Sequence, residues 1–264
     1  MVFIPSGTFT MGSDRHYPEE APAHDVSVDG FWIDRHPVTN EDFARFVKVT
    51  DYVTFAERTA DPLKYPGAKP ELLVPSSVVF RKPIQQVDLR NHYNWWFYVP
   101  GANWRHPLGP SSSIEKKATH PVVHVAFEDA QAYARWAGKA LPTEAEWEFA
   151  ARGGLNSAEF SWGNEFTPGG VHLANTWQGE FPYQNLGTDG FAGTSPVGAF
   201  PSNGYGLFDM AGNVWGWTVD WYQSHQDIQR SFPSEHPTVD VVVRAQAGAD
   251  AEAGLDEVAA SSGL

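Results

Sequence analysis

Two histidines and three alternating glutamates are the side chains whose spacing first suggests chemistry. His120 and His124 have a spacing found in metal sites, but the proline between them breaks a helix and no carboxylate follows closely. We therefore expect these imidazoles to pack or to form hydrogen bonds. Carboxylates for acid–base work are offered by Glu144, Glu146 and Glu148. Glu146, however, completes a helix capping box that begins at Thr143, which explains it better.

Several catalytic signatures are absent from the 264 residues. There is no Gly-x-Ser-x-Gly string of the kind that presents a nucleophilic serine, although composition leaves a Ser-His-Asp triad open. There is also no Gly-x-x-x-x-Gly-Lys-Ser/Thr phosphate loop. The chain has no cysteine, so it supplies no disulfide, no thiolate metal ligand and no thiol chemistry.

The composition describes an acidic chain rich in turns and large rings. With 18 basic and 32 acidic residues the formal net charge is −14, which repels phosphate backbones and disfavours nucleic-acid binding. The 24 glycines, 20 prolines and 11 tryptophans leave little room for long helices. No apolar run approaches the roughly 20 residues that a membrane helix needs. The N-terminus carries no secretory signal, so we expect a cytoplasmic protein.

Capping residues and periodicity predict three helices after an N-terminal β segment. The first is capped by Thr39 or Asn40, and its apolar positions are Phe43, Phe46 and Val47. The second covers residues 127–137, with one face made of Ala130, Tyr133, Ala134 and Ala137. The third begins at Thr143 and presents Trp147, Ala150 and Ala151. Before them, a strand pair around Asp29-Gly30 is predicted from Val26, Val28, Phe31 and Ile33.

Two regions lack such patterns. Residues 57–113 show no sustained period and contain eight prolines, but their aromatic clusters indicate a packed segment rather than a disordered one. After Tyr222 the composition becomes acidic and poor in rings. This change predicts a domain over residues 1–222 and a disordered acidic tail over 223–264, with a weak helix near Leu255 to Ala260.

Five local strings closely resemble those of one known family. They are DRHPVTN from Asp34, GANWRHP from Gly101, LPTEAEWE from Leu141, ANTWQG from Ala174 and NGYGLFDMAGNVW from Asn203. Their order and spacing, from residue 2 to residue 222, resemble the formylglycine-generating enzyme family, also called sulfatase-modifying factors. The resemblance implies an α+β fold that is poor in regular secondary structure and related to C-type lectins.

The resemblance also implies an activity, the oxidation of newly made sulfatases. Family members convert the Cys of a Cys-x-Pro-x-Arg segment to formylglycine, using molecular oxygen and a copper(I) ion held by two cysteines. Soft thiolates suit copper(I), whereas His and carboxylates favour harder metals. The family's C-terminal segment with these cysteines has no counterpart after Tyr222, so we expect this chain to be inactive as written.

Two calcium sites are carried over from the family by position. For the first, the resemblance implies four ligands: the Asn175 side chain, the Thr176 carbonyl, the Asp189 carboxylate and the Phe191 carbonyl. On spacing alone, these residues also fit ordinary turns. For the second it implies Asp209, the Gly212 and Val214 carbonyls, and a glutamate that is replaced here by Gly216. Calcium affinity follows ligand charge, so we expect the second site to be weak or empty.

A substrate surface is expected at Asn103, Trp104 and Arg105, although a structural tryptophan with an arginine stacked on it explains the same string. Three functions remain open. The chain is a truncated or frame-altered formylglycine-generating oxidase, or a cysteine-free paralogue that binds sulfatases or their peptides without oxidising them. The third alternative, a calcium-dependent lectin-like module, rests on fold analogy alone. The expected partners are sulfatase polypeptides, with no nucleic acid and no membrane.

Overall fold

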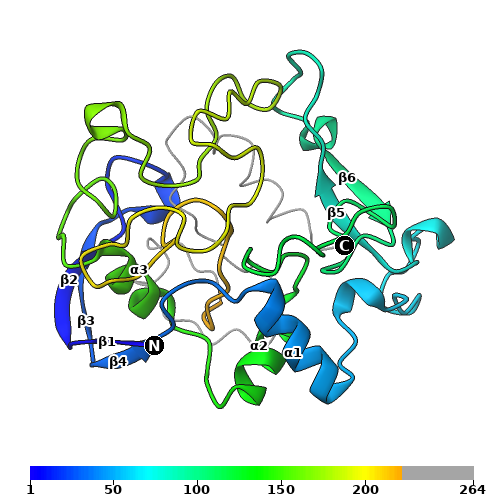
Figure 1. The fold of residues 1–264 in the computed structure, drawn as a ribbon, viewed down its shortest axis with the longest axis horizontal. Coiled ribbons are helices and arrows are strands. Elements are labelled where there is room, and N and C mark those ends of the chain that lie inside the picture. The colour runs from blue at the N-terminus through cyan, green and yellow to red at the C-terminus, as the bar shows by residue number, and fades with distance from the viewer. Residues whose placement is uncertain (222–264) are drawn as a thin grey trace.

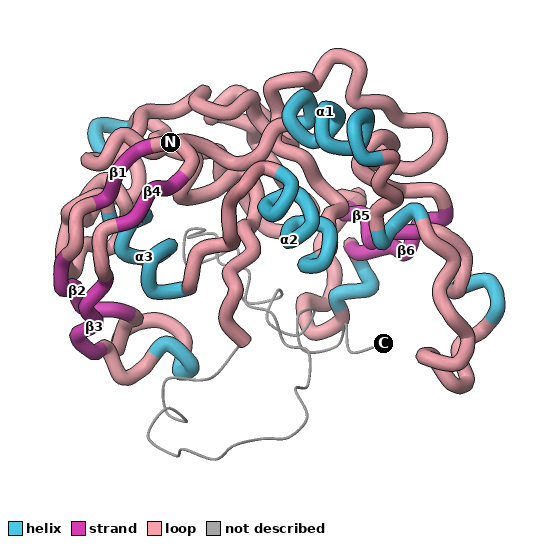
Figure 2. Tube along the Cα trace, turned by 90° about the horizontal axis from the view of Figure 1, so that it is seen from below, coloured by secondary structure: helices cyan, strands magenta, loops and turns pink. Residues whose placement is uncertain are grey.

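The computed structural model describes residues 1–221, in which short elements are linked by long ordered loops (Figures 1 and 2). The helices there are α1 (Asn40–Thr50), α2 (Phe127–Trp136) and α3 (Glu144–Arg152). The strands are β1 (Val2–Ile4), β2 (Gly7–Met11), β3 (His24–Val28), β4 (Phe31–Ile33), β5 (Ser76–Phe80) and β6 (Trp96–Pro100). Single 3-10 turns lie at Pro18–Glu20, Phe55–Glu57, Pro70–Leu72, His92–Asn94 and Pro168–Gly170. The expected α+β fold with little regular secondary structure is confirmed.

The first four strands form one interrupted antiparallel ribbon. β1 pairs with β4 and β2 pairs with β3, and the register that joins Val2 to Ile33 continues through Gly7 and Val28. The predicted pairing of two strands around Asp29-Gly30 is therefore wrong, although both strands exist. Pro5 separates β1 from β2 and has no N–H to donate, so the ladder is interrupted opposite the Asp29-Gly30 link.

Helix α3 covers the β2–β3 part of this ribbon, as both views show (Figures 1 and 2). The predicted capping box is confirmed: Thr143 Oγ1 accepts from the Glu146 N–H at 3.1 Å, and a Glu146 carboxylate oxygen accepts from the Thr143 N–H at 2.8 Å. The Phe149 ring packs against Phe9 with centroids 5.3 Å apart. This buried cluster is completed by Ile4, Met11, Val28, Ala150, Ala151, Leu207 and Met210.

Helices α1 and α2 lie side by side and enclose a second core (Figures 1 and 2). Thr39 caps α1, and the predicted apolar face is buried together with the indole of Trp104. Helix α2 ends at Trp136, one residue before its predicted end. Its Asp129 is completely buried and accepts hydrogen bonds from the Tyr52 hydroxyl and the Phe55 and Ala126 amides. Burial raises the pKa of this carboxyl.

The segment predicted to lack regular structure contains a β hairpin. β5 and β6 pair in register from Ser76–Pro100 to Phe80–Trp96, far from the N-terminal ribbon (Figure 1). The prediction missed them because prolines border both strands and a long connection separates them, so neither a short turn nor simple alternation marks the pair. The aromatic clusters do pack, as expected: Trp95 is completely buried and its ring meets Phe181 at 5.4 Å.

The acidic tail predicted to be disordered, residues 223–264, lies outside the described residues. The helix predicted near Leu255 to Ala260 lies outside them as well. Among residues 1–221, no helix combines the length and the apolar character needed to cross a membrane.

Candidate metal sites and substrate surface

Two of the residues assigned to the first calcium site, Thr176 and Phe191, donate backbone hydrogen bonds to the carboxylate of a third, Asp189. Asp189 accepts a hydrogen bond from the Thr176 N–H at 3.1 Å on one oxygen and from the Phe191 N–H at 2.9 Å on the other. Asn175 lies next to Thr176 in the chain. These two loops come together across the Gly187–Gly190 turn, in which both glycines have positive φ. The fold therefore gathers the predicted first-site residues.

The atoms offered at this place are suited to a hard cation. Within residues 1–221, the side-chain oxygen of Asn175 and the carbonyl oxygen of Phe191 accept no hydrogen bond. The hydroxyl of Thr176 is buried and also has no partner there. Asp189 receives only neutral backbone donors. Amide, carbonyl and carboxylate oxygens form the mixed set that calcium prefers, so the residues fit this ion.

The residues assigned to the second calcium site lie on a tightly turned loop. Asp209, Gly212 and Asn213 have φ of 54°, 71° and 62°, all in the left-handed region. Both oxygens of Asp209 already accept hydrogen bonds, one from the Gly198 N–H at 2.7 Å and one from Asn213 Nδ2 at 3.1 Å. The Gly212 carbonyl accepts from the Val214 N–H at 2.8 Å. Gly216 adds no ligand and the Gly212 carbonyl is already hydrogen-bonded, so this donor set offers fewer free oxygens than the first.

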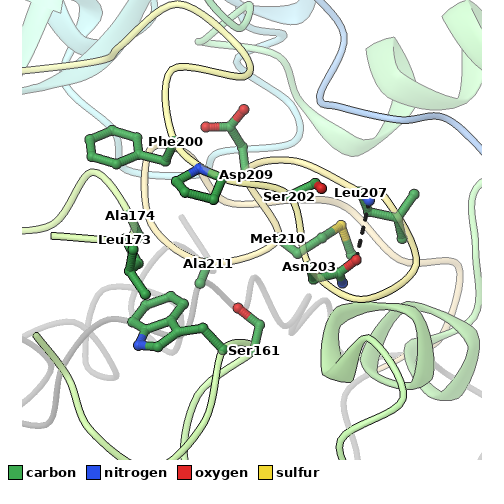
Figure 3. Close-up of a pocket in the computed structure, with 12 residues that line it drawn as sticks. Ser161, Leu173, Ala174, Phe200, Ser202, Asn203, Leu207, Asp209, Met210 and Ala211 are labelled. Atoms are coloured by element: carbon green, nitrogen blue, oxygen red, sulfur yellow. Dashed lines mark hydrogen bonds between the residues drawn. The ribbon is translucent and has the colours of Figure 1, made fainter. Parts of the chain in front are cut away.

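A small pocket lies beside the second loop (Figure 3). Its cavity of about 40 Å³ is large enough for a few water molecules or one small group. Most of its wall is apolar, with side chains from Trp162, Leu173, Phe200, Leu207 and Met210. The carboxylate of Asp209 points away from Met210 and Ala211 in this view (Figure 3). The pocket is therefore lined by both apolar and polar side chains, with Asp209 among the latter.

The expected substrate string forms a tight turn on the α1–α2 core. The Asn103 side-chain oxygen accepts from the Arg105 and His106 amides at 2.8 and 3.1 Å, so it holds the turn. Trp104 is only 2% exposed and belongs to the core. The Arg105 guanidinium lies 4.2 Å from the centre of the Trp104 ring and pairs with Glu57. Trp104 is therefore closed to a partner, whereas Asn103 is half-buried and the Arg105 side chain is 42% exposed.

The histidines form hydrogen bonds, as the sequence suggested. His124 uses both ring nitrogens, with Nδ1 2.7 Å from the Ser77 hydroxyl and Nε2 2.8 Å from the Pro107 carbonyl. His120 Nδ1 lies 3.0 Å from the Thr194 hydroxyl. Burial lowers the pKa of both imidazoles. Their hydrogen bonds hold separate segments of the chain together.

Residues 1–254 match the family model described as "Sulfatase-modifying factor enzyme 1-like domain". The chain belongs to the sulfatase-modifying factor family. It is 57% identical over 228 residues to a formylglycine-generating enzyme of Mycobacterium tuberculosis, and the match covers 86% of this chain and 76% of that relative.

Two further relatives show the breadth of the sulfatase-modifying factor family and its fold. The chain is 47% identical over 236 residues to "Inactive C-alpha-formylglycine-generating enzyme 2" of Mus musculus, covering 87% of this chain and 71% of that protein. The solved structure of PvdO from Pseudomonas aeruginosa superposes with a TM-score of 0.59 at 27% identity, covering 92% of this chain and 80% of the other. Relatives named as enzymes and a relative named as inactive thus share most of this chain's length.

The copper site that the sulfatase-modifying factor family implies does not fit the residues of this chain. The 264 residues include no cysteine to supply a thiolate. Within residues 1–221, no three His, Asp or Glu side chains are gathered closely enough to hold a metal. The two calcium places are compatible with this observation, because each uses one carboxylate and otherwise amide or carbonyl oxygens.

Sequence reasoning overlooked two amides at the candidate metal sites. Gln178 donates to the Thr176 carbonyl, and its side-chain oxygen lies 3.4 Å from the Asp189 nitrogen. Asn213 contacts residues of both candidate sites. Each stands inside a string that carried the resemblance, but nothing in its residue type or spacing distinguished it from an ordinary loop amide.

Proposed function

We propose that this chain is a non-catalytic sulfatase-modifying factor, which binds the sulfatase polypeptide without oxidising it. The observation that carries the proposal is the absence of cysteine from all 264 residues. The resemblance implies a reaction on copper(I) held by thiolates, and within residues 1–221 no three His, Asp or Glu side chains are gathered to hold a metal in their place. The relative of Mus musculus named as inactive, at 47% identity, supports a role of this kind.

The proposed binding surface includes the turn at Asn103, Trp104 and Arg105. Trp104 is anchored in the core, and Asn103 fixes the backbone of the turn. Arg105, 42% exposed at its side chain, is stacked and ion-paired, so little conformational entropy remains to be lost when it contacts a peptide. A preordered cation beside an aromatic ring is able to contact peptide carbonyls or carboxylates.

We further propose that the first site holds calcium as a structural ion. The residues that would hold it are Asn175, Thr176, Asp189 and Phe191. A bound calcium ion supplies positive charge that ties separate loops together, and it takes no part in oxidation here. The second place, with Gly216 where the family has glutamate, is proposed to be weak or empty.

The test uses a synthetic peptide with a Cys-x-Pro-x-Arg segment, copper(I) and oxygen. We expect the protein to bind this peptide more tightly than a scrambled peptide, and to form no aldehyde by mass spectrometry. Aldehyde formation above a control with metal alone would contradict the lack of catalysis. Equal binding of the intended and scrambled peptides would contradict the recognition role.

A second candidate is favoured by the composition, which changes abruptly after Tyr222. An altered reading frame in a gene for a formylglycine-generating oxidase would produce such a change. Sequencing the DNA across that codon tests the idea. A second frame that encodes a cysteine-bearing family segment supports a damaged oxidase, whereas its absence supports the cysteine-free binding protein.

A further inference from the structure

Asn213 joins the two candidate calcium loops. Its backbone N–H donates to the Asn175 carbonyl at 2.9 Å, and its side-chain oxygen lies 3.4 Å from Asn175 Nδ2. Its Nδ2 donates to Asp209 at 3.1 Å. One residue thus contacts a first-site residue through backbone and side chain, and a second-site residue through its amide.

The same side-chain amide also holds the segment at Ser195, which lies between the two loops in the sequence. The Asn213 oxygen accepts from the Ser195 N–H at 2.9 Å, and Nδ2 donates to the Ser195 carbonyl at 3.2 Å. Ser195 is completely buried. The amide therefore bonds to three segments, and a rotation of its plane would break contacts in all of them.

The backbone leaves this junction little freedom. A Cβ added to Gly212 would lie 2.2 Å from the Asn175 carbonyl oxygen, so the two loops touch backbone to backbone. Asn213 itself has a φ of 62°, a conformation that asparagine tolerates better than most residues. Displacement of Asn175 must consequently displace the 209–214 loop.

The second loop is held by hydrogen bonds where a cation would otherwise bind. Asn213 Nδ2 and the Gly198 N–H occupy the two oxygens of Asp209, and neither donor carries a charge. The amide thus links Asp209 to the first site without a metal at the second.

We propose that Asn213 is a positioning residue that couples calcium binding at the first site to the order of the 209–214 loop. This inference rests on the proposed calcium site. Calcium contacting the free Asn175 oxygen would fix that side chain, and Asn213 would transmit the constraint to Asp209. The reverse also holds, because coupling between two sites is reciprocal.

The test measures calcium affinity by calorimetry and amide hydrogen exchange by mass spectrometry, with and without calcium. Asn213→Gly is the informative variant, since glycine keeps the left-handed backbone and removes the amide. We expect its calcium affinity to fall about fivefold or more, the lower range of typical couplings. Calcium should slow exchange over 187–191 and 209–214 in the unchanged protein, but only over 187–191 in the variant.

Asn203→Ala is the matched control. Asn203 is also an amide that joins segments, since it donates to the Ala150 and Ala151 carbonyls, but it forms no hydrogen bond with either candidate site. We expect this variant to lose stability and to keep both calcium responses. Asp189→Asn should abolish binding and identifies the site.

The outcomes separate the two proposals. If the unchanged protein binds no calcium, the proposed calcium site is wrong and the coupling falls with it. A different result would overturn the coupling alone. In that case calcium binds and Asp189→Asn abolishes the binding, but Asn213→Gly keeps the calcium affinity and the protection of residues 209–214. The calcium site then stands and the coupling is wrong.

Discussion

The Nδ1 atom of His124 lies 2.7 Å from the Ser77 hydroxyl, a contact that fastens strand β5 to the segment before helix α2. The opposite nitrogen, Nε2, faces the Pro107 carbonyl at 2.8 Å. A carbonyl only accepts, so Nε2 carries the proton of the neutral ring and Nδ1 accepts from Ser77. The neutral ring thus satisfies both neighbours.

This arrangement predicts a pH-dependent contribution to stability. Burial lowers the pKa of His124 in the folded protein, so the unfolded chain takes up the proton first as the pH falls. The stabilisation by neutral His124 is complete above the pKa of the unfolded chain, about 6.5. It is lost as the pH falls from that value toward the lower pKa of the folded protein. Asn tolerates the left-handed backbone at His124, where φ is 58°, and His124→Asn does not titrate.

We expect the unchanged protein to exceed His124→Asn by about 1 kcal/mol in unfolding free energy at pH 7.5, with a smaller margin at pH 5. Urea unfolding at both pH values measures this difference. Ser77→Ala should lose part of the same margin at pH 7.5, because Nδ1 then has no donor. An equal margin for His124→Asn at both pH values would show that this ring does not govern the pH response.

Restoring a carboxylate at position 216 is predicted to create calcium binding at the second loop. A Cβ at Gly216 would meet only the Trp147 indole nitrogen, at 3.6 Å, which is ordinary contact. The Cβ of a Gly216→Glu variant therefore fits, and the added charge strengthens a site that now has one carboxylate. We expect calorimetry to show an additional calcium ion, or about a tenfold gain in affinity, about 1.4 kcal/mol.

Gly216→Gln is the matched control for that variant, because it has nearly the same size and no charge. Calcium binding that rises equally in both variants would mean that the charge is not responsible. Binding that rises in neither would mean that Asp209 and the carbonyls of this loop do not form a cation site.

The exposed part of the Asn103–Arg105 turn is predicted to contribute to peptide recognition. Arg105→Ala removes the guanidinium that stacks on the buried Trp104 ring. We expect the affinity for a Cys-x-Pro-x-Arg peptide to fall about tenfold, the loss of about one charged hydrogen bond. Fluorescence anisotropy with a labelled peptide measures it.

Arg90→Ala provides the comparison for this loss of charge. Arg90 is an exposed arginine that pairs with Asp88 in the β5–β6 connection. We expect it to leave peptide affinity unchanged. A similar loss for both variants would indicate a general charge effect, and no loss for Arg105→Ala would remove the turn from the binding surface.

The helices could be predicted because their ends are marked locally. Thr39 and Thr143 each cap a helix, and the apolar periods that follow do not depend on distant residues. The strand partners could not be predicted in the same way. Strand β4 pairs with β1, which lies more than twenty residues away in the sequence, and not with the neighbouring β3.

The candidate sites show the same division between local and distant information. The string that contains Asn175 was assigned by resemblance, and the fold does bring it to Asp189. The contacts of Asn213 depend on three segments, at 175, 195 and 209, that meet only after folding. A single sequence carries no pattern for such a meeting, so this junction was visible only in the structure.

Two aromatic side chains, Phe43 and Trp32, are opposite in exposure and are therefore predicted to differ in their contribution to stability. Phe43 is 1% exposed, and its ring packs against Phe46, Trp104 and Tyr133 with centroids 5.3 to 5.9 Å apart. Phe43→Ala would leave a cavity between α1 and α2, and we expect it to cost about 3–5 kcal/mol. Trp32 is 62% exposed and touches Phe3 across the β1–β4 sheet.

Trp32→Ala removes a larger ring from the surface, yet we expect it to cost no more than about 1.5 kcal/mol, the upper value for an aromatic pair. Guanidinium unfolding of both variants, with similar m values, measures the two losses. Similar costs for the two variants would mean that the α1–α2 interface is not a tightly packed core. A much larger cost for Phe43→Ala would show that the stability of this region depends on the aromatic cluster around Phe43. That cluster also holds Trp104, on which Arg105 stacks.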